Sequence, residues 1–248
     1  MKILSFSGGR TSAYMLANYE FDLAIFCNTG KEDEGTLDFI RKCGEYFDKE
    51  IIWLEYTTDV KEKFKIVNFE TANRNGKPFE QLIKKSKFIP NEMTRTCTLQ
   101  LKIKTIQRYL KSKSINLDDV DMMLGIRKDE PKRYFKLKSS NRNKWENVMP
   151  LYKDNITEKH IKEYWKNQPF DLNIHSHLGN CDLCFHKKIS KKQNILNEMP
   201  HIAEWWIEME NYIGATFNKN YSVSELLKMS KEQLNLFDSD IECFCNID

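Results

Sequence analysis

Long hydrophobic runs are missing from this sequence of 248 residues. No apolar stretch approaches the roughly 20 residues of a membrane-spanning helix, which excludes a helical integral membrane protein. The few residues before the first glycines are too short for the apolar part of a signal peptide, so we expect no export. The net charge of +3 is small, which excludes a chain that binds nucleic acid through its overall charge. Repeats and low-complexity linkers are also lacking.

The remaining composition is that of a globular protein. Hydrophobic residues make up 40% of the chain and charged residues 30%, and the length suits one domain or two small ones with a sizeable core. The seven cysteines stand in a chain without an export signal, so free thiols or metal ligands are favoured over disulfides. We therefore predict a cytoplasmic protein without a membrane partner.

The first half of the chain alternates between short apolar runs and helical patterns. Four runs predict buried strands: Ile3–Phe6, Leu23–Cys27, Ile51–Leu54 and Val120–Leu124. Three patterns between them predict helices: Ser12–Tyr19, Thr36–Phe47 and Thr98–Leu110, the last with Leu99, Ile103, Ile106 and Leu110 on one face. This alternation predicts an α/β fold with a parallel sheet covered on both sides.

The pattern changes after about Pro150, where helical stretches follow one another. They are Thr157–Asn167, Lys187–Glu198, Ile202–Tyr212 and Val223–Met229. We predict a nucleotide-binding α/β domain over residues 1–150 and a helical, cysteine-containing extension packed on it over residues 151–248. The polar segment from Thr57 to Pro90 has little periodicity and is predicted to be a mobile flap.

The stretch "SFSGGRTSAY" passes from a strand through two glycines directly into a helix. Glycines let the backbone approach a ligand closely, and a helix N-terminus presents free N–H groups and a positive dipole end. Together these features favour a phosphate site, although an ordinary strand–helix turn has the same outline. Asn28-Thr29-Gly30 and Gly125-Ile126-Arg127 also follow predicted strands, so all three loops should meet at one sheet edge.

Six stretches, in order along the chain, resemble a known family. "SFSGGRTSAY" resembles the PP-loop of the adenine nucleotide alpha-hydrolase superfamily, whose pattern is SGGxxS. Five others resemble its phosphoadenylyl sulfate (PAPS) reductase-like branch: "FCNTGKEDEGTLDFI", "RTCTLQLKI", "GIRKDEPKR", "GNCDLCFHKK" and, faintly, "ECFCNID". The resemblance implies a Rossmann-like parallel sheet that binds an adenine nucleotide, ATP or adenylyl sulfate, at its carboxyl edge.

The nucleotide site expected from these motifs has three parts. Backbone N–H groups and hydroxyls of the glycine loop would surround a phosphate, the loop after the second strand would border the nucleotide, and arginines would approach a phosphate or sulfate from the opposite side. The predicted residues are Ser7, Gly8, Gly9, Thr11, Ser12, Asn28, Thr29, Gly30, Gly125, Arg127 and Arg133. Arg10 is left outside the site.

Three acids follow the second strand. Glu32, Asp33 and Glu34 could hold Mg²⁺ between phosphates, but acids at a helix start also suit the helix dipole without any ligand. The dipole interpretation is favoured.

The remaining cysteines form a second candidate site. Cys97, the pair Cys181 and Cys184, and one of Cys243 or Cys245 could together hold a [4Fe-4S] cluster, with zinc as an alternative. A redox CxxC pair and a set of incidental buried thiols stay open. Core positions are expected instead for Cys27 and Cys43, and solvated ones for His175 and His177.

Three functions compete. In the favoured one, the enzyme cleaves ATP to AMP, through an adenylate, and pyrophosphate, in support of sulfur or nucleotidyl transfer to an acceptor. In the second, a sulfonucleotide reductase uses Cys243 or Cys245 as nucleophile together with a thioredoxin-like reductant. The third is a nucleotide-binding module without turnover. Retention of both loop glycines and the absence of the family's ECG tail, here "ECFCNID", favour the first. The sulfur donor and a homo-oligomeric state stay open.

The stretch "GIRKDEPKRYFKLKSSNRNKW" holds eight lysines or arginines with aromatic residues between them. Such a mixture can bind single-stranded nucleic acid. A solvated rim, or a frame for a small anionic substrate, is the favoured interpretation.

Overall fold

The computed structural model describes residues 1–139, 144–175, 177–179 and 181–234. Its centre is a six-stranded sheet of order β4-β3-β2-β1-β5-β6. The strands are β1 (Lys2–Phe6), β2 (Leu23–Asn28), β3 (Ile51–Tyr56), β4 (Phe64–Val67), β5 (Asp121–Met123) and β6 (Glu146–Val148). The α/β fold with a Rossmann-like sheet is therefore confirmed.

All neighbouring strands run parallel except β3 and β4. In the register, Phe6 lies beside Phe26 and Leu4 beside Met123, so β1, β2 and β5 end at the same edge of the sheet. Strands of this kind are buried on both faces, which explains why each central strand reads as a short apolar run.

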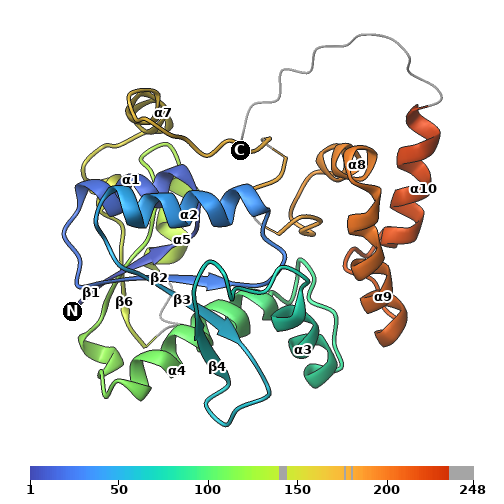
Figure 1. The fold of residues 1–248 in the computed structure, drawn as a ribbon, viewed down its shortest axis with the longest axis horizontal. Helices are drawn as coiled ribbons and strands as arrows, with labels where there is room; N and C mark the ends of the chain where they lie inside the picture. Colours follow the sequence, from blue (N-terminus) through green and yellow to red (C-terminus); the bar gives the residue numbers. More distant parts are fainter. Residues whose placement is uncertain (140–143, 176, 180, 235–248) are drawn as a thin grey trace.

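Helices cover both faces of the sheet (Figure 1). On one face α1 (Arg10–Asn18), α2 (Glu34–Tyr46) and α7 (Glu158–Lys166) bury side chains such as Leu16, Phe39 and Trp165 against β1 and β2. On the other face α4 (Lys104–Ser112) buries Ile106 and Leu110 against the opposite sides of the same strands. These two clusters hold the sheet edge, and thus the loops at that edge, in place.

A third core forms among the C-terminal helices. It joins α3 (Lys77–Ser86), α8 (Ile189–Glu198), α9 (Ala203–Ile213) and α10 (Val223–Leu234), which gather at one end of the sheet in Figure 1. Two short helices, α5 (Pro131–Lys138) and α6 (Pro150–Lys153), flank β6. In the described part of the chain, no helix combines the length and apolar character needed to cross a membrane.

The predicted flap from Thr57 to Pro90 is wrong. This segment contains β4 and α3, and α3 buries Phe79 and Ile83 in the third core. The sequence does not predict strand β4, because this strand lies at the sheet edge, where Lys65 and Ile66 are both exposed. An edge strand need not alternate between apolar and polar residues as clearly as a half-buried one.

The helix predicted from Thr98 to Leu110 begins differently from the expectation. Its first part, Thr98–Ile103, is a π-helical turn, and only the rest is α-helix. The wider turn shifts the phase of the side chains, so Leu101 is fully buried while Leu99, predicted on the apolar face, is 40% exposed.

Candidate functional site

The glycine loop turns sharply between β1 and α1. Gly8 has a φ of +80°, and a Cβ atom there would lie 2.7 Å from Cγ2 of Thr36 in α2. Only glycine fits this left-handed conformation without strain. Gly9, the next residue, has a φ of −100°, and its added Cβ would meet nothing closer than Ser7 Oγ at 3.7 Å. The two glycines therefore have different roles. Gly8 adopts the left-handed conformation that the turn requires, and the absence of a side chain at Gly9 leaves space beside the loop.

Ser12 organises the loop from inside α1. Its hydroxyl donates to the Gly9 carbonyl at 2.9 Å and accepts the Ser7 N–H at 3.2 Å, and the two serine hydroxyls lie 3.0 Å apart. No side chain caps the N-terminus of α1, and its first turn holds no acid. The N–H groups of this turn are thus left for a ligand, and an anion is the ligand that suits them.

Arg10 has partners away from the glycine loop. Its guanidinium donates two hydrogen bonds to Asp171, at 2.6 and 2.8 Å, and one to the Leu172 carbonyl. Its charge therefore serves to fasten α1 to the segment after α7.

The loop after β5 lies against the glycine loop. A Cβ at Gly125 would be 3.3 Å from Thr11 Cγ2, and Arg127 Nη1 donates to Thr11 Oγ1 at 3.3 Å. Acids surround Arg127: its Nε is 3.1 Å from Asp129 and 3.7 Å from Glu130. Arg133 is mostly exposed and is also paired with Glu130. The structure thus brings Arg127 to the loop and leaves Arg133 farther out on the surface of α5.

The loop after β2 is built largely from internal contacts. Asn28 is fully buried, and its amide donates to Glu55 at 2.7 Å and to the Asn73 carbonyl at 2.8 Å. Thr29 is bonded to Glu32, and Gly30, with a φ of +80°, lies against Gly76. As nucleotide contacts these three residues stay predictions. The side chains of Asn28 and Thr29 already have partners in the protein.

The three acids near α2 have separate partners. Asp33 caps α2 by accepting from the Gly35 N–H at 2.8 Å, and Glu34 binds Arg74 at 2.7 Å. Glu32 turns away from the helix and accepts from the backbone and hydroxyl of Thr29. The helix-dipole interpretation fits Asp33 and Glu34, whereas Glu32 belongs to the thiol site described next.

The CxxC loop lies directly on the loop after β2. Cys181 pairs through its backbone with Glu32 in an antiparallel bridge, and its sulfur is 3.4 Å from Thr29 Oγ1. Burial, followed by the negative charge of Glu32, raises the pKa of the Cys181 thiol well above its usual range. Burial also raises the pKa of Cys97, and the charge of Cys184 raises it further. Three of the cysteines predicted as metal ligands are therefore electrostatic neighbours.

Lys102 supplies the positive charge of this thiol site. Burial, the largest single influence, lowers its pKa, but Glu32, Cys181 and the other nearby thiols together raise it above its usual value. Cys27, buried as predicted, and Cys97 add to the same effect. The sequence does not predict Lys102 at this site, because the groups that influence it come from distant segments of the chain.

A buried ion pair fastens the CxxC loop to the sheet edge. Lys31 Nζ lies 2.9 Å from Asp182 Oδ2, with side chains that are 8% and 12% exposed. The Asp182 N–H donates to the Lys31 carbonyl at 2.9 Å, and Trp206 Nε1 donates to Asp182 Oδ1 at 2.7 Å. Trp205 adds a cation–π contact, its ring centre being 4.9 Å from Lys31 Nζ. No sequence pattern signals this pair, since its members are far apart in the chain.

Two further groups brace the same loop. The Lys187 ammonium donates to the carbonyls of His177 and Asp182, at 2.5 and 2.8 Å. Burial lowers the pKa of Lys187 to about 8, although the charges of Asp182 and Cys184 act in the opposite direction. The expectation of a solvated His177 is wrong: it is buried, 3.0 Å from Glu198.

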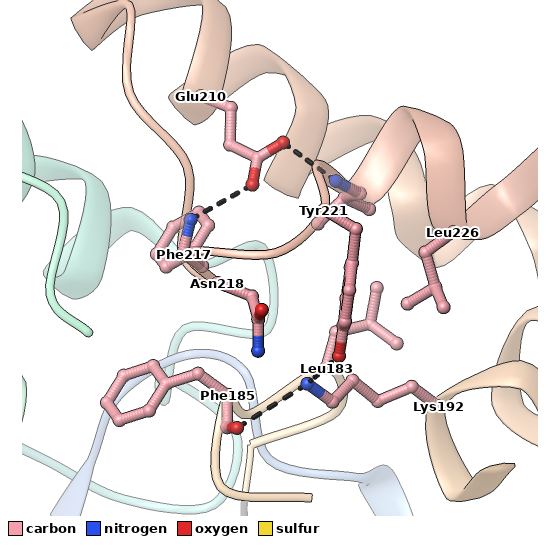
Figure 2. A pocket seen from close by; sticks show the side chains of 9 residues that line it. Leu183, Phe185, Lys192, Glu210, Phe217, Asn218, Tyr221 and Leu226 are labelled. Atoms are coloured by element: carbon pink, nitrogen blue, oxygen red, sulfur yellow. Dashed lines mark hydrogen bonds between the residues drawn. The ribbon is translucent and has the colours of Figure 1, made fainter. Parts of the chain in front are cut away.

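A small cavity lies behind the loop, between α8, α9 and α10 (Figure 2). Lys192, which is buried, lines it and bonds to Tyr221 Oη at 2.9 Å. Across the cavity the Glu210 carboxylate accepts from the N–H groups of Phe217 and Val223, at 3.0 and 2.8 Å. These bonds tie the helices together beneath Leu183 and Phe185 of the CxxC loop.

Within the residues described, no group of three or more Cys, His, Asp or Glu side chains is arranged to hold a metal ion. Cys97, Cys181 and Cys184 alone thus do not form a metal centre. Cys243 and Cys245, predicted as ligands and as catalytic residues, lie outside the described residues.

Comparison with known proteins agrees with the fold and with the sheet-edge loops. Residues 2–175 match the sequence family of the phosphoadenosine phosphosulfate reductase domain. The matched segment includes the glycine loop and ends before the CxxC pair. An uncharacterized nin region protein of Escherichia phage lambda, ORF290, is 30% identical over 214 residues, covering 77% of this chain and 68% of that protein. The resemblance found in the motifs is confirmed: the chain belongs to the phosphoadenosine phosphosulfate reductase domain family, in the PP-loop superfamily.

Proposed function

We propose that this protein binds ATP at the glycine loop and cleaves it between the α- and β-phosphates. An acceptor oxygen attacks the α-phosphorus, the bond to the β-phosphate breaks, and pyrophosphate leaves with the electron pair. A sulfur donor or another nucleophile would then attack the acceptor atom that carries the adenylylated oxygen, the bond between that atom and the oxygen would break, and AMP would leave with the electron pair. The observation that carries this proposal is the loop itself, with both glycines in place before an uncapped α1.

The proposed chemistry depends mainly on position and charge. N–H groups at the start of α1 would hold the leaving pyrophosphate, and Arg127 would approach the nucleotide from the loop after β5. Mg²⁺ would accompany the phosphates and neutralise their charge. Asp33 and Glu34 are already bonded to Gly35 and Arg74, so the nucleotide oxygens would be its main ligands.

We further propose that Cys97, Cys181 and Cys184 bind a [4Fe-4S] cluster, or zinc, with Cys243 or Cys245 as the fourth ligand. The mutual influence of the three described thiols and the positive charge of Lys102 support this assignment. A free redox pair is disfavoured, because a reactive thiolate needs a lowered pKa and burial raises that of Cys181.

The second candidate is reduction of adenylyl sulfate or its 3′-phosphorylated form. The family match favours it, because the matched domain is named for that reaction. The thiolate of Cys243 or Cys245 would attack the sulfur atom and release the adenosine phosphate, and a thioredoxin-like reductant would then free sulfite. A nucleotide-binding module without turnover is the third candidate.

Product analysis separates the three. We expect AMP and pyrophosphate from ATP once an acceptor is supplied, and binding without AMP for an analogue with a non-hydrolysable α,β bridge. Release of ADP and inorganic phosphate would mean that the bond between the β- and γ-phosphates breaks, and this result would overturn the proposal. Sulfite from adenylyl sulfate would establish the reductase instead. Binding of ATP without any product, across candidate acceptors, would leave the binding module.

A further inference from the structure

Helix α5 stands apart from the other helices of the sheet region because it contains no buried residue. A helix on the surface of a globular protein normally buries an apolar stripe against the core. Lys132, Phe135, Lys136 and Lys138 are all exposed. Packing therefore does not explain why this helix combines basic and aromatic side chains.

The aromatic residues of α5 contact one another and Tyr152 at the surface. Tyr134 stacks face to face on Tyr152 of α6, with ring centres 3.7 Å apart and planes 9° apart. Phe135 meets Tyr134 edge-on at 5.3 Å and is itself 62% exposed. Lys138 Nζ lies 5.7 Å from the centre of the Tyr134 ring, so the ring that is most open to a flat ligand is that of Phe135.

The lysines around these rings keep their charge available. Among the described residues, Lys132, Lys136 and Lys138 make no ion pair, and neither does Lys128, which lies 4.5 Å above the Tyr152 ring. The arginines differ, since Glu130 pairs with both Arg127 and Arg133. The net charge of this surface therefore comes from lysines, which attract phosphates as point charges.

The position of α5 connects this surface to the glycine loop. The chain enters α5 just after Arg127, which contacts Thr11 of that loop. A long anionic ligand on α5 would therefore pass close to the nucleotide loop.

We propose that α5 and Tyr152 form a docking surface for single-stranded nucleic acid. The lysines would contact successive phosphates, and an exposed base would stack on Phe135. A duplex fits less well because its base faces are covered by their neighbours. That the bound strand carries the acceptor atom rests on the proposed function; the docking surface itself does not.

The test measures binding in the absence of ATP, by fluorescence anisotropy with labelled oligothymidylate and oligouridylate of about 20 nucleotides. Lys132→Ala/Lys136→Ala/Lys138→Ala should weaken binding at least tenfold and reduce the slope of log K against log salt by about 2, since three phosphate contacts are lost. Phe135→Ala should weaken binding about fivefold or more through lost stacking. The matched control, Lys61→Ala/Lys104→Ala/Lys111→Ala, removes three exposed lysines elsewhere and should leave affinity unchanged.

Several results would overturn the docking surface: no binding of either oligonucleotide, an equal loss in the control triple variant, or equal competition by a duplex. Competition by polyglutamate together with an unchanged Phe135→Ala variant would point to an acidic protein partner instead. Each of these leaves the ATP products unaffected. Conversely, absence of AMP formation with retained oligonucleotide binding would refute only the proposed function and the acceptor assignment.

Discussion

The glycine loop and the thiol site lie side by side at one edge of the sheet, yet they are built in opposite ways. The glycine loop is local, since Ser7, Gly8, Gly9 and Ser12 are close in sequence and bond mainly to one another. The thiol site joins three distant segments, which carry Glu32, Cys97 and Cys181. The first presents backbone N–H groups, and the second presents side chains.

This contrast determines what each region needs. A local loop needs the correct residue at each φ angle, and a single added side chain can fill its ligand space. An assembled site needs the ties that bring its segments together, above all the Lys31–Asp182 pair. Damage to those ties should loosen the thiol site while the glycine loop persists.

The largest effect on stability is expected from Asp182→Asn. It leaves the Lys31 ammonium buried without its partner, which typically costs about 3–5 kcal/mol of unfolding free energy. The control Glu45→Gln breaks an exposed pair with Arg41 and should cost under about 1 kcal/mol. Denaturant unfolding measures both, and calorimetry should still find ATP binding by folded Asp182→Asn. Equal costs for the two variants would show that the pair does not hold the loop.

Gly9→Val should reduce ATP affinity by about a hundredfold or more, which corresponds to roughly 2.7 kcal/mol. The fold should persist, because Gly9 has an ordinary φ and space around its Cβ position. Gly8→Ala should instead act mainly on stability and lower the unfolding midpoint. The positive φ of Gly8 and the nearby Thr36 side chain both disfavour a Cβ atom there. Gly179→Ala is the control, because its added Cβ would lie within 4 Å of no atom of the described residues beyond its chain neighbours. Unchanged calorimetric affinity in Gly9→Val would remove the phosphate site.

The Cys→Ala series tests whether the thiol site holds a metal. Purified without oxygen, Cys181→Ala and Cys184→Ala should lose bound iron or zinc and some stability, because ligand binding is coupled to folding. Cys43→Ala is the control, since Cys43 is buried in the core of the sheet. Equal metal content in all variants, or metal in none, would refute the assignment. Loss of sulfite release in Cys243→Ala or Cys245→Ala, with metal retained, would favour the reductase.

The smallest effect concerns pH. Burial raises the pKa of Cys43 from 9.0 to about 12. Between these values the folded state holds a proton that the unfolded state has lost, so the contribution of Cys43 to stability is present below pH 9 and disappears as pH rises toward 12. The slope is at most about 1.4 kcal/mol per pH unit. Urea unfolding at pH 8 and above pH 10 should show a shallower loss in Cys43→Ala than in the parent; an identical loss would contradict the assignment.

The sequence predicted the elements whose residues follow a single local pattern, such as apolar periodicity or a glycine required by a turn. The four central strands and helices α1, α2 and α7 follow apolar periodicity, and Gly8 is demanded by its turn. The sequence shows α5 only as a basic stretch, because a helix without buried residues lacks apolar periodicity. Strand β6 was missed because three residues at a sheet edge carry too little pattern.

By itself, then, the sequence determined the parallel sheet, the glycine loop and the family, because these depend on residues that are near neighbours in the chain. Only the tertiary structure decided which distant residues become neighbours. Glu32 pairs with Cys181, and both influence Lys102. Asp182 forms an ion pair with Lys31, and Asn28 donates a hydrogen bond to Glu55. Such contacts depend on how the C-terminal helices pack against the sheet. Packing is the sum of many weak apolar contacts, so it cannot be predicted from any single residue in the sequence.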